Sequence, residues 1–269
     1  MQSMPRRTCV FWKGGFMKRV FLGTIYIACV ILIASSTHAF EVGVRGYYWF
    51  PVLKGDISVE GNGVSGTDLD LDDDLGVGDE FYPIVEAFLG LGDHHVSLSY
   101  YHADYSGTKD LTKAITFNGK AFAQNQRVST SLEYDVSDLM YQYDLLDLEN
   151  ILAGFSLGIV GRVKLIDGRI QVKSGTQDEK EDFTEAIPML GANLHIGILA
   201  DIVEARVLAT GIRYGDGTVF DGLAEISYTP FPFLDIHGGY RAFFIDLDVD
   251  DVDLNYNTSG PYVALTVGF

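Results

Sequence analysis

An alternation of apolar with small or polar residues constrains this chain more than any other feature. In the last segment, residues 260–269 (GPYVALTVGF), apolar residues take every second position from Pro261 to Phe269. A period of two is typical of a β-strand whose two faces meet different surroundings. Ten segments show it: residues 40–50, 81–91, 94–105, 134–146, 151–166, 185–199, 204–214, 219–228, 233–245 and 260–269. The sequence therefore predicts an all-β protein of about ten strands, with eight or twelve as alternatives.

The connections between these segments come in two lengths. Short turns follow the second, fourth, sixth and eighth segments. Longer polar connections, at residues 51–80, 106–127, 167–184 and 246–259, follow the first, third, fifth and ninth, and only the connection GDGT after the seventh is brief. Short turns at one end and long loops at the other are typical of a membrane-spanning β-barrel. An even number of strands places both ends of the barrel domain on one side.

The outward-facing sets explain why we expect a closed barrel rather than an open sheet. They are almost wholly apolar or aromatic, and in lipid every backbone polar group needs an internal partner. An open sheet with such faces also has aggregation-prone edges. We therefore expect a closed antiparallel barrel in which the final strand pairs with the first and places Phe269 in the wall.

The first 39 residues are typical of a secretory signal peptide. Lys18 and Arg19 precede an apolar run, and Thr37 and Ala39 form a small-residue cleavage site. We expect translation to start at Met17 and cleavage after Ala39, which leaves residues 40–269 as one barrel domain. A transmembrane anchor is less favoured because the apolar run, about 16 residues, is shorter than the roughly 20 that a spanning helix needs. A lipoprotein signal at Cys29 is less favoured because the run continues past it.

Charge and cysteine content narrow the possible functions. Both cysteines, Cys9 and Cys29, lie in the leader, and a mature chain without cysteine suits an oxidising compartment where disulfides are not used. Five of the basic residues are in the leader, so the mature chain has 14 Lys and Arg against 37 Asp and Glu, a net charge of −23. This acidic balance argues against binding of nucleic acid, whose phosphates require Lys and Arg.

The leader, the alternating strands and the terminal strand that ends in Phe269 together resemble the bacterial outer-membrane β-barrel proteins. This resemblance implies export through the periplasm, insertion in the outer membrane, and contact with outer-membrane lipid and lipopolysaccharide. It also implies that Phe269 is part of the signal that the barrel-assembly machinery recognises. It names no subfamily and leaves the oligomeric state open.

The alternation also predicts which side chains face the lumen. The inward set is Glu41, Arg45, Glu86, Ser97, Ser99, Asp138, Gln142, Asp144, Arg162, Lys164, Glu185, Asn193, His195, Glu204, Arg206, Asp221, Glu225, Asp235, His237 and Arg241. Since buried charges are costly unless they are paired, we expect a connected network. Its main candidates are Arg45, Glu86, Asp138, Arg162, Glu185, His195, Glu225, Asp235, His237 and Arg241. Ten strands leave little free space, which favours a filled lumen, with a narrow channel for small solutes or ions as the alternative.

Two acidic stretches lie in the predicted extracellular loops, at residues 68–76 and 246–255. Asp68, Asp70, Asp72, Asp248 and Asp250 are candidate Ca²⁺ ligands, because calcium takes six to eight oxygen atoms. The EF-hand pattern is absent, and a solvated, repulsive rim explains the same residues. In the second stretch Leu247 and Val249 change parity relative to Ile236 and Phe244. Either a bulge intervenes or lipid no longer dictates which face is apolar.

Catalysis is the least favoured function. Asp235 and His237 form an Asp-x-His pair, as in the omptins, which are ten-stranded outer-membrane proteases, but here the pair lies near the periplasmic end. A lipid deacylase needs a serine beside a histidine, and Ser97, Ser99, His94, His95 and His102 show no diagnostic arrangement. No phosphate loop, zinc pattern or dinucleotide motif is present, and no cofactor is implied apart from possible Ca²⁺. We expect a non-catalytic barrel that presents acidic loops to cations or partners.

Aromatic residues cluster near the strand ends and favour a membrane-interface girdle over carbohydrate stacking. They are Tyr47, Tyr48, Trp49, Tyr100, Tyr141, Tyr143, Tyr240 and Phe243.

Overall fold

The computed structural model describes residues 40–61, 63–148, 154–175, 177–199, 202–215, 217–249 and 252–269, with the backbone alone described at 248, 249 and 252. The expected signal peptide, residues 1–39, lies outside the described residues. The strands are β1 (Phe40–Trp49), β2 (Val52–Val59), β3 (Leu69–Asp70), β4 (Tyr82–Leu91), β5 (His94–Asp110), β6 (Ile115–Phe117), β7 (Lys120–Phe122), β8 (Arg127–Asp147), β9 (Phe155–Ser174), β10 (Gln177–Gly197), β11 (Val203–Tyr214), β12 (Gly217–Phe231), β13 (Leu234–Val249) and β14 (Val252–Gly268). Among the described residues, no helix is long and apolar enough to cross a membrane.

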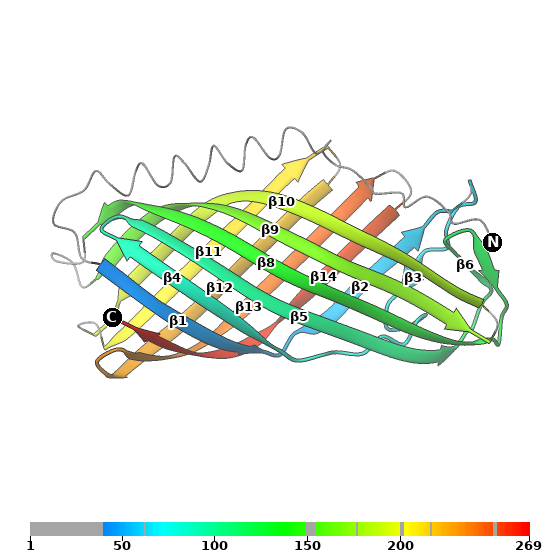
Figure 1. Ribbon diagram of the computed structural model, residues 1–269, viewed down its shortest axis with the longest axis horizontal. Coiled ribbons are helices and arrows are strands. Elements are labelled where there is room, and N and C mark those ends of the chain that lie inside the picture. Colours follow the sequence, from blue (N-terminus) through cyan, green and yellow to red (C-terminus); the bar gives the residue numbers. More distant parts are fainter. Residues whose placement is uncertain are drawn as a thin grey trace.

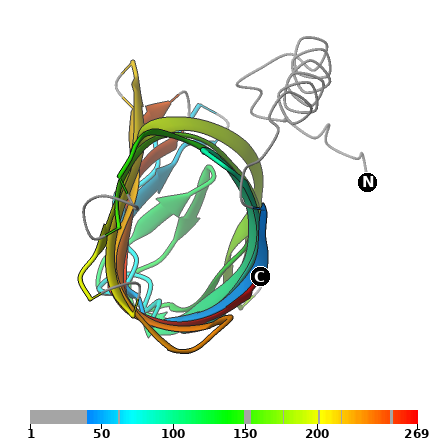
Figure 2. The same cartoon turned by 90° about the vertical axis from the view of Figure 1, so that its left-hand side faces the viewer.

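The barrel strands close into an antiparallel ring, as Figures 1 and 2 show. Their order is β1-β4-β5-β8-β9-β10-β11-β12-β13-β14, and β14 pairs back with β1. The predicted closed barrel of ten strands is confirmed. A row of paired residues that leaves β1 at Val42 passes through all ten strands and returns at Lys54, twelve positions further along the chain. This stagger requires strands that are strongly tilted against the barrel axis.

The seam of the barrel joins β14 to two strands in succession. β1 pairs with the second half of β14 and β2 with the first half, in one continuous register, and Phe50 donates its N–H to the carbonyl of Pro261 across the break. Val42 and Phe269 exchange both of their backbone hydrogen bonds, at 3.1 and 2.9 Å. Phe269 therefore lies in the wall, as its position in the alternation predicts.

The two ends of the barrel differ. The turn end carries Phe40, Phe269 and the short connections β4–β5 and β12–β13. At the opposite end, the loop end, the wall is much longer than the sequence predicts: residues 167–184 and 246–259, expected to be polar loops, are mostly parts of β9, β10, β13 and β14. Residues 51–80 and 106–127 likewise contain β2, β3, β6 and β7 with the ends of β5 and β8. The prediction of long loops was wrong because strand pairing continues where the apolar outward face ends.

The apolar face changes sides along the strands. Near the turn end, exposed apolar side chains form a belt with a member on every barrel strand: Val42, Val85, Leu98, Leu139, Ile159, Leu190, Val207, Ile226, Ile236 and Val263. Toward the loop end the buried, inward side chains are the apolar ones, as Ile166, Ile170 and Val172 show on β9. β13 and β14 pair without a break from Leu234 to Val249. The parity change at Leu247 is therefore not caused by a bulge. It marks the level beyond which the outward side chains of β13 no longer belong to the belt.

A cap fills the space between the extended strands at the loop end. We define it as the β6–β7 hairpin together with residues 63–80; Figure 2 shows the hairpin inside the outline of the ring. Asn118, at the tip of the hairpin, donates its backbone N–H to Val59 of β2 and its side-chain amide to Glu181 of β10. The cap contributes a set of buried apolar residues: Leu69, Leu71, Leu75, Val77, Ile115, Phe117 and Phe122. It therefore joins opposite walls through a hydrophobic core.

Candidate functional site: the charged lumen

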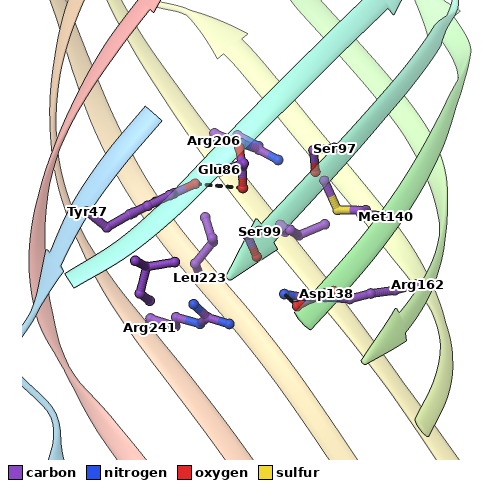
Figure 3. A pocket seen from close by; sticks show the side chains of 12 residues that line it. Tyr47, Glu86, Ser97, Ser99, Asp138, Met140, Arg162, Arg206, Leu223 and Arg241 are labelled. Atoms are coloured by element: carbon purple, nitrogen blue, oxygen red, sulfur yellow. Dashed lines mark hydrogen bonds and ion pairs between the residues drawn. The ribbon is translucent and has the colours of Figure 1, made fainter. Parts of the chain in front are cut away.

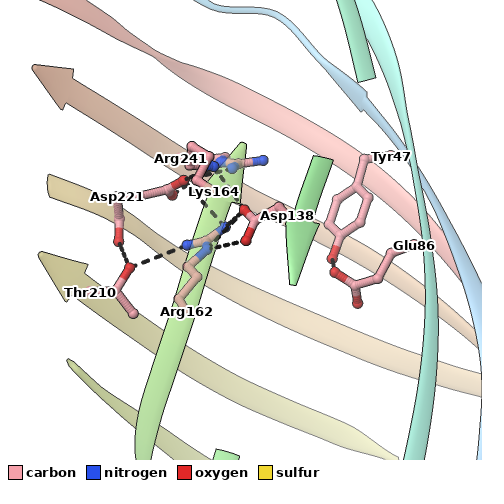
Figure 4. A network of polar contacts seen from close by, with 8 residues as sticks. All are labelled: Tyr47, Glu86, Asp138, Arg162, Lys164, Thr210, Asp221 and Arg241. Carbon is pink, nitrogen blue, oxygen red and sulfur yellow. Dashed lines mark hydrogen bonds and ion pairs between the residues drawn. The ribbon is translucent and has the colours of Figure 1, made fainter. Parts of the chain in front are cut away.

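Five charged side chains meet at the middle of the lumen, and we call them the central layer: Asp138 of β8, Arg162 and Lys164 of β9, Asp221 of β12 and Arg241 of β13 (Figure 4). All are at most 8% exposed. Arg162 donates from Nε to Asp138 at 2.8 Å, and Lys164 Nζ lies 2.7 Å from Asp138 and 2.9 Å from Asp221. Arg241 reaches Asp221 at 2.8 Å. The layer ties β8 and β9 to β12 and β13 across the barrel.

Aromatic rings cover the side of the central layer that faces the cap. The guanidinium of Arg241 lies 5.1 Å from the ring centre of Trp49 and 5.9 Å from that of Tyr101, and Lys164 Nζ lies 5.0 Å from that of Phe243. Such contacts stabilise desolvated cations. The prediction that Trp49, Phe243 and Tyr47 belong to an outer girdle was wrong, since all three are buried in the lumen. Their parity with Arg45 and Arg241 is the signal that identifies them as inward.

A second cluster lies between the central layer and the turn end. Glu225 lies 3.4 Å from Arg45 and 3.6 Å from Arg206, and it also accepts a hydrogen bond from the hydroxyl of Tyr262. Tyr47 donates its hydroxyl to Glu86 at 3.1 Å. This cluster contains two arginines and two carboxylates, so its formal charges balance.

The histidines each meet a different acceptor. His95 lies 3.0 Å from Asp144, and His195 lies 3.1 Å from Glu204, both near the turn end. His237 Nε2 lies 2.8 Å from the Thr266 hydroxyl, while Asp235 accepts a hydrogen bond from Thr229. Asp235 and His237 therefore hold separate partners. Glu185 is half-buried on the inner face of β10, beyond the central layer and outside both clusters.

A small cavity separates the two clusters (Figure 3). Its volume is about 20 Å³, enough for one water-sized particle. It is lined by Tyr47, Ile84, Glu86, Ser97, Ser99, Asp138, Met140, Arg162, Arg206, Leu208, Leu223 and Arg241. Between the central layer and the cap, the inward side chains are mostly apolar residues and tyrosines, with Glu185 and Thr258 as polar exceptions.

The first acidic stretch is folded into the cap instead of being a free loop. Leu69, Leu71 and Leu75 are buried, and the carboxylate of Asp70 accepts backbone N–H bonds from Asp72 and Asp73 at 2.9 and 2.6 Å. Within the described part of the chain, no group of three or more His, Cys, Asp or Glu side chains is placed to hold a metal ion. Asp250 lies outside the described residues, as does the side chain of Asp248, so the calcium site remains a prediction.

The charged groups of this acidic surface have different partners. Lys113 lies 2.9 Å from Asp74, and that hydrogen bond raises the pKa of Lys113. Asp56 pairs across the strands with Asp70; partial desolvation, followed by the carboxylates of Asp68 and Asp70, raises the pKa of Asp56. The loop end therefore concentrates negative charge that its lysines only partly offset.

The belt determines the surroundings of the barrel. A continuous ring of exposed Val, Leu, Ile and Phe is far larger than the apolar patches of soluble monomers. Closure of the strands leaves no unpaired edge within the belt, as a hydrocarbon environment requires. Exposed Tyr48, Tyr100, Tyr141 and Tyr240 agree with the predicted girdle. In barrels of this kind the short turns face the periplasm, which makes the turn end periplasmic and the loop end extracellular.

No protein-family model matches the chain, and no curated protein matches it. Among solved structures it is similar to the attachment invasion locus protein Ail of Yersinia pestis, at 11% identity over 84% of this chain and 98% of that one, with a TM-score of 0.36. It is similar to Neisserial surface protein A at 14% identity (87% and 100% covered, TM-score 0.32), and to the translocator domain of NalP from Neisseria meningitidis at 12% identity (97% and 99% covered, TM-score 0.40). At these values the comparisons assign neither a family nor an activity. On its strand closure and its belt, the chain is an integral β-barrel protein of the bacterial outer membrane.

Proposed function

We propose that this protein is a non-conducting, non-catalytic barrel that anchors an acidic extracellular module, made of the cap and the strand ends around it. Outside the cell, this module meets cationic partners. One observation carries the proposal: the central layer and the cap lie one above the other across the lumen. A solute crossing the barrel would have to separate buried ion pairs and then displace an apolar core, each at a cost of several kcal/mol.

The extracellular module supports the binding half of this proposal. Its exposed carboxylates include Asp72, Asp73 and Glu80 of the cap and Asp178 of β10, and the cap packs through its buried apolar residues. A surface of one charge attracts partners of opposite charge and accelerates their association.

Conductance in planar lipid bilayers tests the first half. The folded protein is expected to give no steady current, beside a general porin as the positive control in the same bilayer. A reproducible unitary current from the wild type would overturn the proposal in favour of a narrow channel. The polar part of the lumen between the turn end and the central layer, with its small cavity, is the feature that favours this alternative.

Binding of a fluorescent lysine decapeptide tests the second half. Affinity should fall steeply with salt, and the triple variant Asp72→Asn, Asp73→Asn, Glu80→Gln should bind at least several-fold more weakly. Glu41→Gln, an exposed carboxylate change at the turn end, is the matched control and should bind like the wild type. Equal binding by all three proteins contradicts the proposed role of the module.

A further inference from the structure

The central layer is not neutral. Arg162, Lys164 and Arg241 are three cations, and Asp138 and Asp221 are only two carboxylates. The side chains of all five are at most 8% exposed, so water does not solvate the extra positive charge. The next cluster, with Arg45 and Arg206 against Glu86 and Glu225, has no negative charge to spare. An unbalanced buried charge is costly.

The carboxylates nearer the turn end do not remove this excess. Asp144, whose side chain is 10% exposed, is held by His95 and Gln142, and Glu204, which is 30% exposed, is held by His195. Glu41 is 53% exposed. Asp144 and Glu204 therefore have partners of their own nearer the turn end, and Glu41 is solvated by water.

The cavity of about 20 Å³ lies beside the uncompensated charge. Arg162 and Arg241 line it from the central layer and Arg206 lines it from the opposite side. Arg241 uses Nε and Nη2 on Asp221, and Arg206 uses Nε on Asn193 and Nη1 on Glu225. Each of these two guanidinium groups thus has a further nitrogen for a ligand. The hydroxyls of Ser97 and Ser99 add two neutral donors to the lining.

We propose that this cavity binds one small monovalent anion, of the chloride class, as the counter-ion of the central layer. One negative charge balances the layer, and the volume of about 20 Å³ is of the order that one small ion or one water molecule occupies. The carboxylates in the lining are already occupied: Asp138 is held by Arg162 and Lys164, and Glu86 accepts the hydroxyl of Tyr47.

Crystals grown with bromide in place of chloride test the proposal. The wild type is expected to show an anomalous bromide peak among Arg162, Arg206 and Arg241. Lys164→Met, which removes the excess charge, should lose the peak. Thr210→Val, which removes a neutral hydrogen-bond partner of Arg162 in the same region, should retain it. A wild-type cavity that holds only water would overturn the proposal. That result would mean that the layer is balanced in another way, for example by loss of a proton from Lys164.

A second measurement keeps the proposal testable if Lys164→Met does not fold. The thermal unfolding midpoint of the wild type in detergent should rise with bromide concentration at constant ionic strength set by methanesulfonate. Ser99→Val keeps every charge but fills the cavity and removes a donor, so the bromide-dependent rise should vanish. An equal rise in the wild type and in Ser99→Val would place the anion elsewhere and contradict the assignment.

Discussion

At the scale of single residues, Asp138 is one of the two carboxylates that hold the cations of the central layer together. Asparagine at this position leaves Arg162 and Lys164 buried with one fewer negative charge between them. We expect Asp138→Asn to lower the free energy of unfolding by about 3–5 kcal/mol. Asp135→Asn, three residues away on the outer face and half-exposed beside His102, should cost no more than about 1 kcal/mol. Urea unfolding from detergent micelles compares the two, and similar losses would mean that the central layer does not stabilise the barrel.

A like-charge pair on the outer surface gives a prediction of opposite sign. Asp56 faces Asp70, and its raised pKa means that folding is penalised while Asp56 is ionised. The penalty is present at neutral pH and is relieved as pH falls through the folded-state pKa. Asp56→Asn should therefore stabilise the protein by a few tenths of a kcal/mol, about 0.5 at low salt and neutral pH.

The gain from Asp56→Asn should disappear in acid and shrink as salt shortens the Debye length from about 30 Å at 0.01 M to about 3 Å at 1 M. Unfolding curves at pH 7 and pH 3, with Glu80→Gln as the control carboxylate change, measure this. A gain that is the same in acid and at high salt would show that the effect is not electrostatic.

At this scale the sequence predicts which side chains face the lumen, but it does not predict which of the charged side chains form ion pairs. The alternation alone places Arg45, Asp138, Arg162 and Arg241 on one face of their strands. Which of them meet depends on the stagger of twelve residues around the ring, which brings Arg162 of β9 within 3.3 Å of Asp221 of β12. No local pattern encodes that stagger, because it is a property of the closed sheet.

At the scale of elements, the β6–β7 hairpin is the part of the cap that bridges the walls. Phe117 is fully buried between them. Phe117→Ala should remove about 3–5 kcal/mol of local packing, so residues 111–126 should become accessible to protease while the barrel stays folded. Phe81→Ala, at a side chain that is 53% exposed, is the matched control and should leave digestion unchanged. Protection of the hairpin in both variants would show that the cap does not depend on this core.

The strand segments that the sequence predicts correctly contact different surroundings from those that it does not predict. Strand segments inside the belt have an apolar outward face and a mixed inward face, and all ten were recognised. Beyond the belt, segments such as 167–184 have charged outward faces and resemble solvated loops, although they are paired strands. The alternating leucines Leu69, Leu71 and Leu247 were the available signal for a buried inner face at that level.

At the scale of the whole molecule, one barrel holds two opposite arrangements of polarity. Within the belt, lipid is outside and the charges are inside. Above it, water is outside, and the interior is an apolar core that the cap completes. The change follows from the surroundings of the outer face. Side chains that contact lipid are apolar, and where water replaces lipid outside, the apolar side chains face the interior instead. The molecule therefore combines a membrane barrel with a water-facing β-structure on the same strands.

This arrangement predicts how the cost of a surface charge depends on its place along one strand. Val263 points outward from β14 in the middle of the belt and is 55% exposed, while Asn257 points outward from the same strand toward its extracellular end. Val263→Arg should lower the free energy of unfolding from phospholipid bilayers by about 2–4 kcal/mol, and Asn257→Arg by about 0–1 kcal/mol. Guanidinium unfolding from liposomes, followed by tryptophan fluorescence, measures both. Equal costs at the two positions would mean that hydrocarbon does not contact Val263, and the placement of the belt in the membrane would then be wrong.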